Sequence, residues 1–547
     1  MATEAEVEAE IEVEKEKPKI DIEGPTRNLM QSIKGKVEDS CLGKVEEKEV
    51  DIIPEALVIG GGIAGMYAAL DIADAGFKVH VVERSATIGG HMAQLDKTFP
   101  TLDCSACILT PRMVDVSKHA NINLMSYSEV VGVDGSVGNF KVKVKRKPRC
   151  VYEKDWEYGT LCTGCSLCEQ SCRFAYKFPN EFDENLGKKG SIYRPFPQAI
   201  PAVYCVDPER CQMVKKGKCG KATIESTREA IKRRARGEEV SKDEAPPCVL
   251  ACLPNCIDFD MEEKIEEYNV GTIIVATGYD IIEPELMPEY KYGVLPNVIT
   301  GLEFERYSNA SGPTFGKIIV KGVDRLPKDA VFVSCVGSRN KQTGFEYCSR
   351  VCCMYLAKHA HLLGEKVPDC KITVLYQDVR AFGKGFEEFY DRVKGEGVNY
   401  RRGLASEIYQ KPGSDRVVVR GEDTMLGEPF ELEADIVVLG VGLKPSAGTG
   451  ELLKMLGIEE TPDHFAKEAH LKLRPVDTDI EGIFVTGCVQ APRDIPDSVA
   501  QGKAAAAASL SLLAGGKVKI RTPVEEIDEE LCVGYKSLRE MADKMGA

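Results

Sequence analysis

The clearest pattern near the start of the chain is an apolar run at residues 56–59, an amphipathic stretch at 64–75 and a second apolar run at 78–82. Unbroken apolar runs of this length are typical of strands buried on both faces of a parallel sheet. The order strand, helix, strand therefore predicts the opening of a doubly wound α/β sheet. Comparable runs predict further strands at residues 271–276, 330–334, 371–376, 435–439 and 482–486.

This alternation breaks between residues 148 and 262, where short cysteine-rich pieces replace the apolar runs. We expect an inserted domain there, and within it the highly charged stretch 215–244 predicts a surface helix. The flanking sequence predicts a dinucleotide-binding domain in three parts, at residues 51–147, 263–312 and 435–515, and a second Rossmann-like domain at residues 313–434.

The two ends of the chain differ in composition from these predicted domains. Residues 1–50 are rich in Glu and Lys and almost free of aromatic residues, so they offer too little apolar area to offset the entropy lost on ordering. We therefore predict an acidic disordered tail at residues 1–50 and a separate C-terminal tail at residues 516–547.

A glycine fingerprint follows the first predicted strand directly. Gly60, Gly62 and Gly65 form G-x-G-x-x-G at the start of the predicted helix, which is the context in which this pattern indicates a dinucleotide site. The first glycine permits a tight turn, the second lets the backbone approach a pyrophosphate, and the third allows close packing of the helix. The helix N-terminus favours phosphates, and Glu83 is placed to accept hydrogen bonds from an adenosine ribose.

Later glycine segments favour FAD over NAD as the dinucleotide. Gly89 and Gly90 follow the second predicted strand, Thr277 and Gly278 end another, and Gly487 follows the last. These features resemble flavoproteins of the thioredoxin reductase type, which have two dinucleotide-binding domains. The expected fold class is therefore this α/β architecture with an inserted ferredoxin-like iron-sulfur domain.

Composition changes this picture mainly through the cysteines. Hydrophobic residues make up 43% and charged residues 29% of the chain, which is ordinary for a soluble globular protein. No run approaches the ~20 apolar residues that cross a bilayer and the N-terminus is acidic, so we expect a cytoplasmic protein with no membrane span. A net charge of −15 argues against nucleic-acid binding. The 21 cysteines indicate metal ligation, because disulfides are rare in the cytosol.

The most specific metal motif is C-x2-C-x2-C-x3-C, formed by Cys162, Cys165, Cys168 and Cys172. With this spacing a short loop wraps a 4Fe-4S cubane and presents thiolates to its irons. Zinc is the alternative, although zinc sites usually combine two separated C-x-x-C knuckles. In two-cluster ferredoxins the fourth cysteine serves the other cluster and precedes a proline, whereas Arg173 follows it here.

A second set of cysteines in the same region suffices for a further cubane. The expected ligands are Cys211, Cys219, Cys248 and one or both of Cys252 and Cys256, with Cys205 as a substitute. A degenerate half-module that only retains its thiols is the alternative.

A third group consists of Cys335, Cys348, Cys352 and Cys353. Cys335 ends a predicted strand, at the position where a second nucleotide domain would carry its glycine fingerprint, and no G-x-G-x-x-G is present there. Four thiols around one loop and one helix start suit a non-standard cluster.

Three further cysteines have no assigned role. Cys104 and Cys107 form a C-x-x-C motif that could serve as a redox pair, as two ligands or as a purely structural pair. Cys488 stands where flavoproteins of the thioredoxin reductase type have an acidic residue, so the residue facing the ribityl chain is not assigned.

Four long segments resemble the flavin-bearing A-type component of heterodisulfide reductase, a family of methanogens and other anaerobes. They read FPTLDCSACILTPRMVDV, YCSRVCCMYLAKHA, DVRAFGKGFEEFY and APRDIPDSVAQGKAAAA, and the resemblance runs from Val58 to about Ser509. It implies FAD, several 4Fe-4S clusters and a place in a cytoplasmic complex that passes electrons to thiol or disulfide chemistry on another subunit. The implied partners are the other subunits of that complex, together with a protein electron donor or acceptor, and a homodimer is left open.

The resemblance also implies roles for particular residues. The family's unusual cluster near the flavin corresponds to Cys335, Cys348, Cys352 and Cys353, and its lysine close to the flavin ring corresponds to Lys358. An ordinary solvated helix residue is the alternative for Lys358. In that family the flavin can send the two electrons of a pair to acceptors of different potential.

The chain departs from that family at both ends. The acidic tail replaces a cysteine-bearing N-terminal domain, and IDEELCVGYKSLREMADKMGA begins like a ferredoxin module but keeps only Cys532. We therefore do not expect this chain to bifurcate electrons alone. Two other functions stay open, a self-contained NAD(P)H-dependent disulfide reductase that uses Cys104 and Cys107, and a non-catalytic cluster scaffold. The missing fingerprint near Cys335 disfavours the first, and the FAD fingerprint disfavours the second.

Overall fold

The computed structural model describes residues 46–522 apart from residues 321 and 324. The chain divides into two compact units, residues 51–518 and a unit that contains both chain ends. In the latter, β1 (Glu46–Asp51) and β28 (Lys517–Thr522) form a two-stranded sheet. Residues 46–50, which we expected in a disordered tail, therefore form a strand. Residues 1–45 and most of the predicted C-terminal tail, including Cys532, lie outside the described residues.

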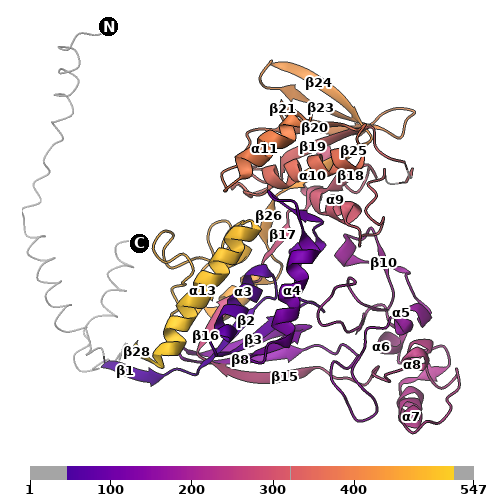
Figure 1. Cartoon of the computed structure of the whole chain (residues 1–547), viewed down its shortest axis with the longest axis vertical. Helices are drawn as coiled ribbons and strands as arrows, with labels where there is room; N and C mark the ends of the chain where they lie inside the picture. Colours follow the sequence, from indigo (N-terminus) through magenta and orange to yellow (C-terminus); the bar gives the residue numbers. More distant parts are fainter. Residues whose placement is uncertain (1–45, 321, 324, 523–547) are drawn as a thin grey trace, which may run out of the picture. The chain divides into compact units, whose positions relative to one another are not determined.

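The first large sheet has five parallel strands in the order β27, β16, β2, β3, β6. Figure 1 labels three of them, β16, β2 and β3. The bounds of the five strands are Ile483–Val485, Thr272–Val275, Glu55–Ile59, Lys78–Glu83 and Ile122–Ser126. Four of these strands were predicted from apolar runs, and their side chains are buried on both faces, which explains the unbroken apolar pattern.

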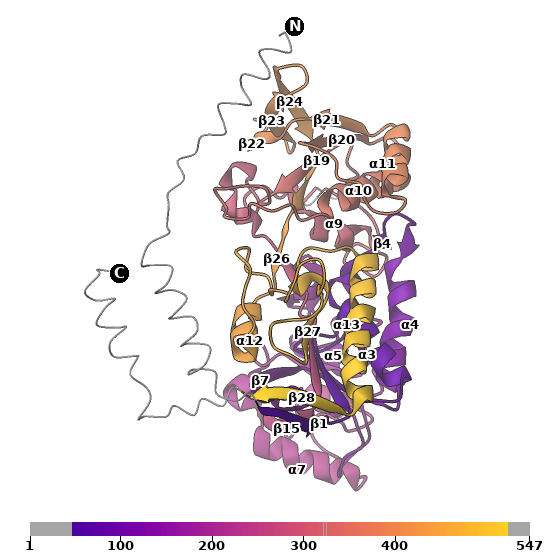
Figure 2. The same ribbon diagram turned by 90° about the vertical axis from the view of Figure 1, so that its left-hand side faces the viewer.

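Helices cover one face of this sheet and an antiparallel sheet adjoins it. The long helix α13 (Ile495–Gly515) packs along α3 (Ile63–Asp74), and α4 (Ser105–Lys118) packs on the other side of α3 (Figure 2). The adjoining sheet has the order β15, β8, β7, with bounds Lys264–Val270, Asn139–Arg146 and Ser128–Ser136. Helix α12 (Thr449–Leu456) contacts β7.

The second large sheet is also parallel, in the order β18, β25, β19, β20, β21. Its strands are Val298–Thr300, Ile436–Val441, Asp329–Val336, Lys371–Tyr376 and Asn399–Arg402. Helices α9 (Gly301–Ser308), α10 (Cys352–Lys366) and α11 (Phe386–Gly395) accompany it. An antiparallel sheet of β22, β23 and β24 belongs to the same region, with bounds Ala405–Gln410, Val417–Asp423 and Glu428–Ala434.

The cysteine-rich region lies between two paired strands. β8 and β15 pair along their whole length, so the chain leaves and re-enters the antiparallel sheet at neighbouring strands. Between them are four short helices, α5, α6, α7 and α8, at Leu167–Ser171, Gln212–Lys216, Ile224–Ala235 and Pro247–Ala251. Three two-stranded sheets complete the region, pairing β9 with β10, β11 with β12 and β13 with β14. Their strands are Phe178–Pro179, Lys188–Lys189, Ile192–Tyr193, Cys205–Val206, Lys218–Cys219 and Ala222–Thr223.

Two further observations bear on the sequence expectations. The predicted surface helix at 215–244 is present only as α7, because a hairpin of β13 and β14 precedes it. Across the described ranges, no helix is both long enough and apolar enough to cross a bilayer.

Candidate functional site

The glycine fingerprint forms a turn that tolerates no side chain at two of its positions. Gly60 has a φ of +113°, and a Cβ there would lie 2.2 Å from the carbonyl oxygen of Ala276. A Cβ on Gly65 would lie 2.0 Å from the carbonyl oxygen of Gly60, so this glycine lets α3 pack against the turn. A Cβ on Gly62 would meet nothing within 4 Å, which leaves its backbone open to a ligand.

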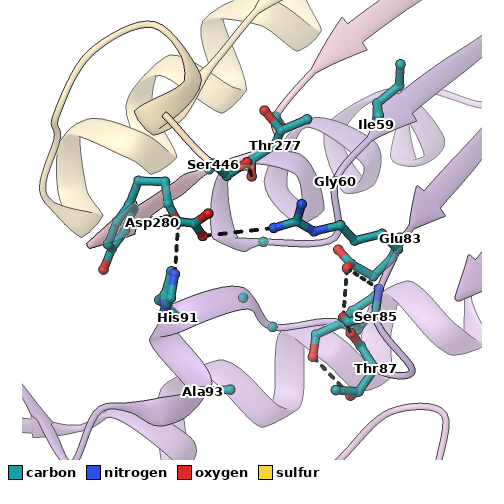
Figure 3. A pocket seen from close by; sticks show the side chains of 18 of the residues that line it. Ile59, Gly60, Glu83, Ser85, Thr87, His91, Ala93, Thr277, Asp280 and Ser446 are labelled. Carbon is teal, nitrogen blue, oxygen red and sulfur yellow. Dashed lines mark hydrogen bonds and ion pairs between the residues drawn. The ribbon is translucent and has the colours of Figure 1, made fainter. Parts of the chain in front are cut away.

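A cavity of about 900 Å³ opens in front of this turn (Figure 3). This volume is at the upper end of the ~300–1,000 Å³ that is usual for ligand sites. Predicted nucleotide-binding residues that line it are Gly60, Gly62, Glu83, Gly89, Gly90, Thr277, Gly278 and Gly487. Gly65 does not line the cavity, because it lies beneath the turn.

Glu83 accepts hydrogen bonds at both of its carboxylate oxygens, and one of them comes from the fingerprint turn. Its Oε2 accepts a hydrogen bond from the Gly61 N–H at 2.8 Å, and its Oε1 accepts from the Ser85 N–H at 2.8 Å. The carboxylate therefore lies at the cavity wall beside the turn. Its contact with a ribose stays a prediction.

Several contacts at the cavity wall were not predicted from the sequence. His91 lies with Nε2 2.9 Å from the carbonyl oxygen of Tyr279 and Nδ1 2.6 Å from Gln94 Oε1, and its ring stacks on Tyr279 (Figure 3). Arg84 extends toward Asp280, 3.9 Å away. These contacts join segments about 190 residues apart in the chain, so no local motif announces them.

The inserted region forms part of the cavity wall. Its residues at this wall include Glu181, Phe182, Tyr193, Pro195 and Phe196. The rings of Phe182 and Phe196 stack with their centroids 4.5 Å apart. A bound dinucleotide would thus contact the same domain that carries two of the cysteine sets.

A second, more apolar cavity continues from the first. The two share Leu95, Tyr279 and Arg493, and the second also includes residues of α9, α10 and the start of α13. The α10 helix contributes Lys358, which is only 1% exposed. The alternative of a solvated helix residue is therefore wrong for Lys358.

Lys358 is held by two partners on different elements. Its ammonium donates to the carbonyl oxygen of Lys97 at 2.8 Å and forms a buried ion pair with Glu305 of α9. The same carboxylate lies 2.5 Å from Nε2 of His359, which is also buried. Burial alone would raise the pKa of Glu305, but Lys358 and His359 lower it to about 2. Burial lowers the pKa of His359 even though Glu305 acts in the opposite direction.

Sequence reasoning missed Glu305, which belongs to no motif, and gave no role to His359, although it lies beside Lys358 in the segment YCSRVCCMYLAKHA. Glu305 lies 53 residues before Lys358, and only the packing of α9 against α10 brings them together. The cavity therefore has a cation and an anion at one wall, both shielded from water.

The cysteines of the inserted region group in space differently from what their spacing in the sequence predicts. Cys172, Cys211, Cys219 and Cys248 line one small cavity. Burial raises the pKa of Cys248, and the negative charges of Cys172, Cys211, Cys168 and Cys219 on ionisation raise it further. The chain turns away after α5, so Cys172 lies beside Cys211, Cys219 and Cys248 and not with the rest of its motif; the cluster that Cys172 would bind stays a prediction.

Five other cysteines of this region form the other set, namely Cys162, Cys165, Cys168, Cys252 and Cys256. Cys256 Sγ lies 3.4 Å from Cys252 Sγ, and hydrogen bonds from Cys256 lower the pKa of Cys252 and Cys162. Burial raises the pKa of Cys168, as do the neighbouring Cys162, Cys252 and Cys165. Cys252 and Cys256 therefore lie with the first motif and not with the second. Cys205 is fully buried and does not line the small cavity of Cys172, Cys211, Cys219 and Cys248.

The third group gathers at the end of β19 and the start of α10. Cys335 has a φ of +59° at an irregularity of the strand, which turns it toward the helix. Burial raises the pKa of Cys335 to about 11, and Cys353 and Cys348 contribute to that rise. Cys352 is buried, and its Sγ lies 3.7 Å from the carbonyl oxygen of Val441, a residue of the second cavity.

The donor sets fit iron-sulfur clusters in their chemistry. Thiolate is the ligand that these clusters require, and each set brings at least four thiols from two or more segments together. In the described part of the chain, no three His, Cys, Asp or Glu side chains close around a single metal ion. The fit thus rests on the number of thiols in each set and on the fact that the chain brings the thiols of one set together.

The C-x-x-C motif forms a disulfide between Cys104 and Cys107 at the start of α4. Cys488 is buried beside Gly487, with its Sγ 3.5 Å from the carbonyl oxygen of Arg493. The role of Cys488 toward a flavin is not assigned by these contacts.

Comparison with known proteins agrees with this geometry. Residues 58–119 match the family described as "NAD(P)-binding Rossmann-like domain". The chain is 49% identical to an A-type iron-sulfur component of the CoB--CoM heterodisulfide reductase of Methanopyrus kandleri, over 90% of this chain and 69% of that protein. It is 45% identical to the A-type component of the H(2):CoB-CoM heterodisulfide,ferredoxin reductase of Methanothermobacter thermautotrophicus, over 94% and 72%.

Solved structures with a similar fold include the thioredoxin reductase of T. acidophilum. It is 13% identical, with a TM-score of 0.45, and the match covers 84% of this chain and 99% of that one. The sequence relatives carry the assignment, because their identity extends over nearly the whole described chain. The chain belongs to the family of A-type iron-sulfur components of heterodisulfide reductase.

Proposed function

We propose that this chain is a flavin- and cluster-carrying electron-transfer component of a cytoplasmic, heterodisulfide-reductase-like complex. The observation that carries the proposal is the position of the dinucleotide cavity between two cysteine-bearing regions. The inserted region forms one wall of that cavity, and the third cysteine group lies beside its apolar continuation. The relatives named as iron-sulfur subunits of heterodisulfide reductases support the same role.

Different residues would bind the cofactor and set the charge around it. The turn at Gly60 and Gly62 would hold a pyrophosphate, and Glu83 lies where a ribose would follow. A bound FAD would supply the exchange between electron pairs and single electrons. Lys358 would place a positive charge in the apolar continuation, and Glu305 would fix its position.

The cysteine sets would hold 4Fe-4S clusters. We assign one to Cys172, Cys211, Cys219 and Cys248, and one to the set of Cys162, Cys165, Cys168, Cys252 and Cys256. The third, on the group at β19 and α10, would take the place that a nicotinamide has in a pyridine-nucleotide reductase. Single electrons would then enter or leave there, and the chain would relay electrons to partner subunits.

Rapid kinetics of flavin reduction test this proposal. The anaerobic protein should show fast bleaching of flavin absorbance with a one-electron donor such as dithionite, and little with NADPH. Cys352→Ser should keep FAD, lose the iron of one cluster and slow the reaction with the one-electron donor, whereas Cys370→Ser, outside all three sets, should leave it unchanged. Fast, saturable bleaching by NADPH, with normal kinetics in Cys352→Ser, would favour a self-contained disulfide reductase instead.

A further inference from the structure

The bonded pair of Cys104 and Cys107 has no part in the function proposed above, and its surroundings differ from those of the other cysteines. Cys107 is exposed and Cys104 is half-buried, while Ile108 beside them is 44% exposed. The pair therefore lies at the protein surface, open to another molecule.

A purely structural role explains this bond poorly. The two cysteines are three residues apart, and closing so short a loop removes little entropy from the unfolded chain. The segment is also held without the bond. Ser105 is fully buried and donates to the carbonyl oxygens of Asp96 and Met92, at 3.0 and 2.7 Å, and Leu109 anchors the helix in the core.

The two sulfur atoms are not equivalent. Cys104 is the N-cap residue of α4, and its Sγ accepts a hydrogen bond from the Cys107 N–H at 3.3 Å. Such a donor stabilises negative charge on Cys104, and partial positive charge at a helix N-terminus acts in the same direction. Cys107 is the more exposed residue and Cys104 has the better leaving group, an arrangement that favours thiol–disulfide exchange at Cys107.

We propose that Cys104 and Cys107 form a thiol–disulfide exchange site that accepts electrons from a dithiol. A thiolate of the dithiol attacks Cys107 Sγ, the S–S bond breaks, and Cys104 leaves as a thiolate and takes up a proton. The second thiol of the dithiol then loses its proton and attacks the mixed disulfide, which releases Cys107 as a thiol. The dithiol is oxidised to a disulfide by two electrons, and the pair in the chain is reduced by the same two.

The site also adjoins the apolar cavity through one short hairpin. Cys104 lies in β5 (Asp103–Cys104) directly opposite Lys97 of β4 (Lys97–Thr98), and the carbonyl oxygen of Lys97 accepts the hydrogen bond from Lys358. The backbone that carries the pair is therefore in contact with the group that we place beside the flavin. The exchange site is therefore linked by backbone contact to the proposed flavin site, but the exchange step itself does not need the flavin.

Peptide-resolved alkylation of the full, anaerobically purified chain tests the proposal. Trypsin releases residues 98–112, a peptide whose only cysteines are Cys104 and Cys107. The folded protein is treated with dithiothreitol or with a reduced thioredoxin, quenched with acid and alkylated, and the mass of the peptide is measured. We expect either dithiol to convert the pair to two alkylated thiols reversibly, and the faster one identifies whether a small or a protein dithiol fits the site.

Single variants distinguish thiol–disulfide exchange from a purely structural role and from a role as metal ligands. With oxidised glutathione, Cys104→Ser should accumulate a mixed disulfide on Cys107, and Cys107→Ser should form one on the less accessible Cys104 roughly tenfold more slowly. Both variants should keep the iron and FAD content of the parent chain and of Cys370→Ser. Reduction of the pair only after denaturation, or a loss of iron in Cys104→Ser, would overturn the proposal. Reduction only after denaturation would leave the assignment of the three cysteine sets untouched, whereas a loss of iron would add Cys104 to the candidate ligands.

Discussion

At the scale of single residues, the apolar cavity is dominated by one buried ion pair. Lys358 and Glu305 are 1% and 2% exposed, so their charges are shielded little by water and each depends on the other. The carboxylate keeps the ammonium at the wall, where it also donates to Lys97. The local sequence predicted the fingerprint glycines, because the turn has no room for a Cβ at Gly60 or Gly65. It could not predict Glu305, whose role depends on the contact of two helices.

Lys358→Met should lower the midpoint potential of the flavin, because a nearby cation stabilises the negatively charged reduced ring. A unit charge about 4 Å away contributes roughly 1 to 4 kcal/mol, or about 20 to 90 mV for a two-electron couple. Spectroelectrochemical titration under anaerobic conditions measures this shift. Glu305→Gln removes the negative partner and should shift the potential upward. Shifts of the same sign in the two variants would contradict this role for the ion pair.

His359 should make the folded state sensitive to acid. Burial lowers its pKa from the ordinary 6.5, so below that value the unfolded chain binds a proton that the folded chain does not. The stability contributed by neutral His359 is thus present above pH 6.5 and is lost as the pH falls through the lowered folded pKa, by at most about 1.4 kcal/mol per pH unit. The midpoint of anaerobic thermal unfolding should fall more between about pH 7.5 and about pH 5.5 in the parent than in His359→Gln. Equal falls would mean that His359 is protonated in the folded chain.

At the scale of elements, the apolar runs predicted the parallel strands and the spacing of cysteines did not predict their partners. Strands β2, β3 and β16 lie in a sheet that is buried on both faces, so their pattern is visible without any tertiary information. Which set a cysteine joins depends on the direction of the chain after a short helix. Helices α5 and α8 lie in contact, and this contact carries Cys172 to one set and Cys252 to the other.

Serine variants of the inserted region should therefore fall into two spectroscopic classes. Cys172→Ser should alter the same electron paramagnetic resonance signal of the reduced protein as Cys211→Ser. Cys165→Ser should alter the other signal, together with Cys252→Ser. If Cys172→Ser and Cys165→Ser removed one and the same signal, the four cysteines of the first motif would share a single cluster after all.

At the scale of the whole described chain, the arrangement is a dinucleotide-binding domain interrupted twice. The inserted region enters and leaves through the paired strands β8 and β15, and the second parallel sheet is formed by residues between β16 and β27. The first interruption forms part of the wall of the nucleotide cavity, and the second brings Cys352 against Val441, a residue that lines the apolar continuation. The order of elements was predictable from the sequence, whereas this convergence was not, because it joins residues from both interruptions.

The content of flavin, iron and sulfide in the anaerobically purified chain tests the central claim most directly. We predict about one FAD per chain, and about four iron and four sulfide for each of the three cysteine sets. Quantitative elemental analysis, sulfide assay and release of the flavin by denaturation give these numbers on one sample. Zinc in place of iron and sulfide, or a chain that holds its clusters with no flavin, would contradict the account.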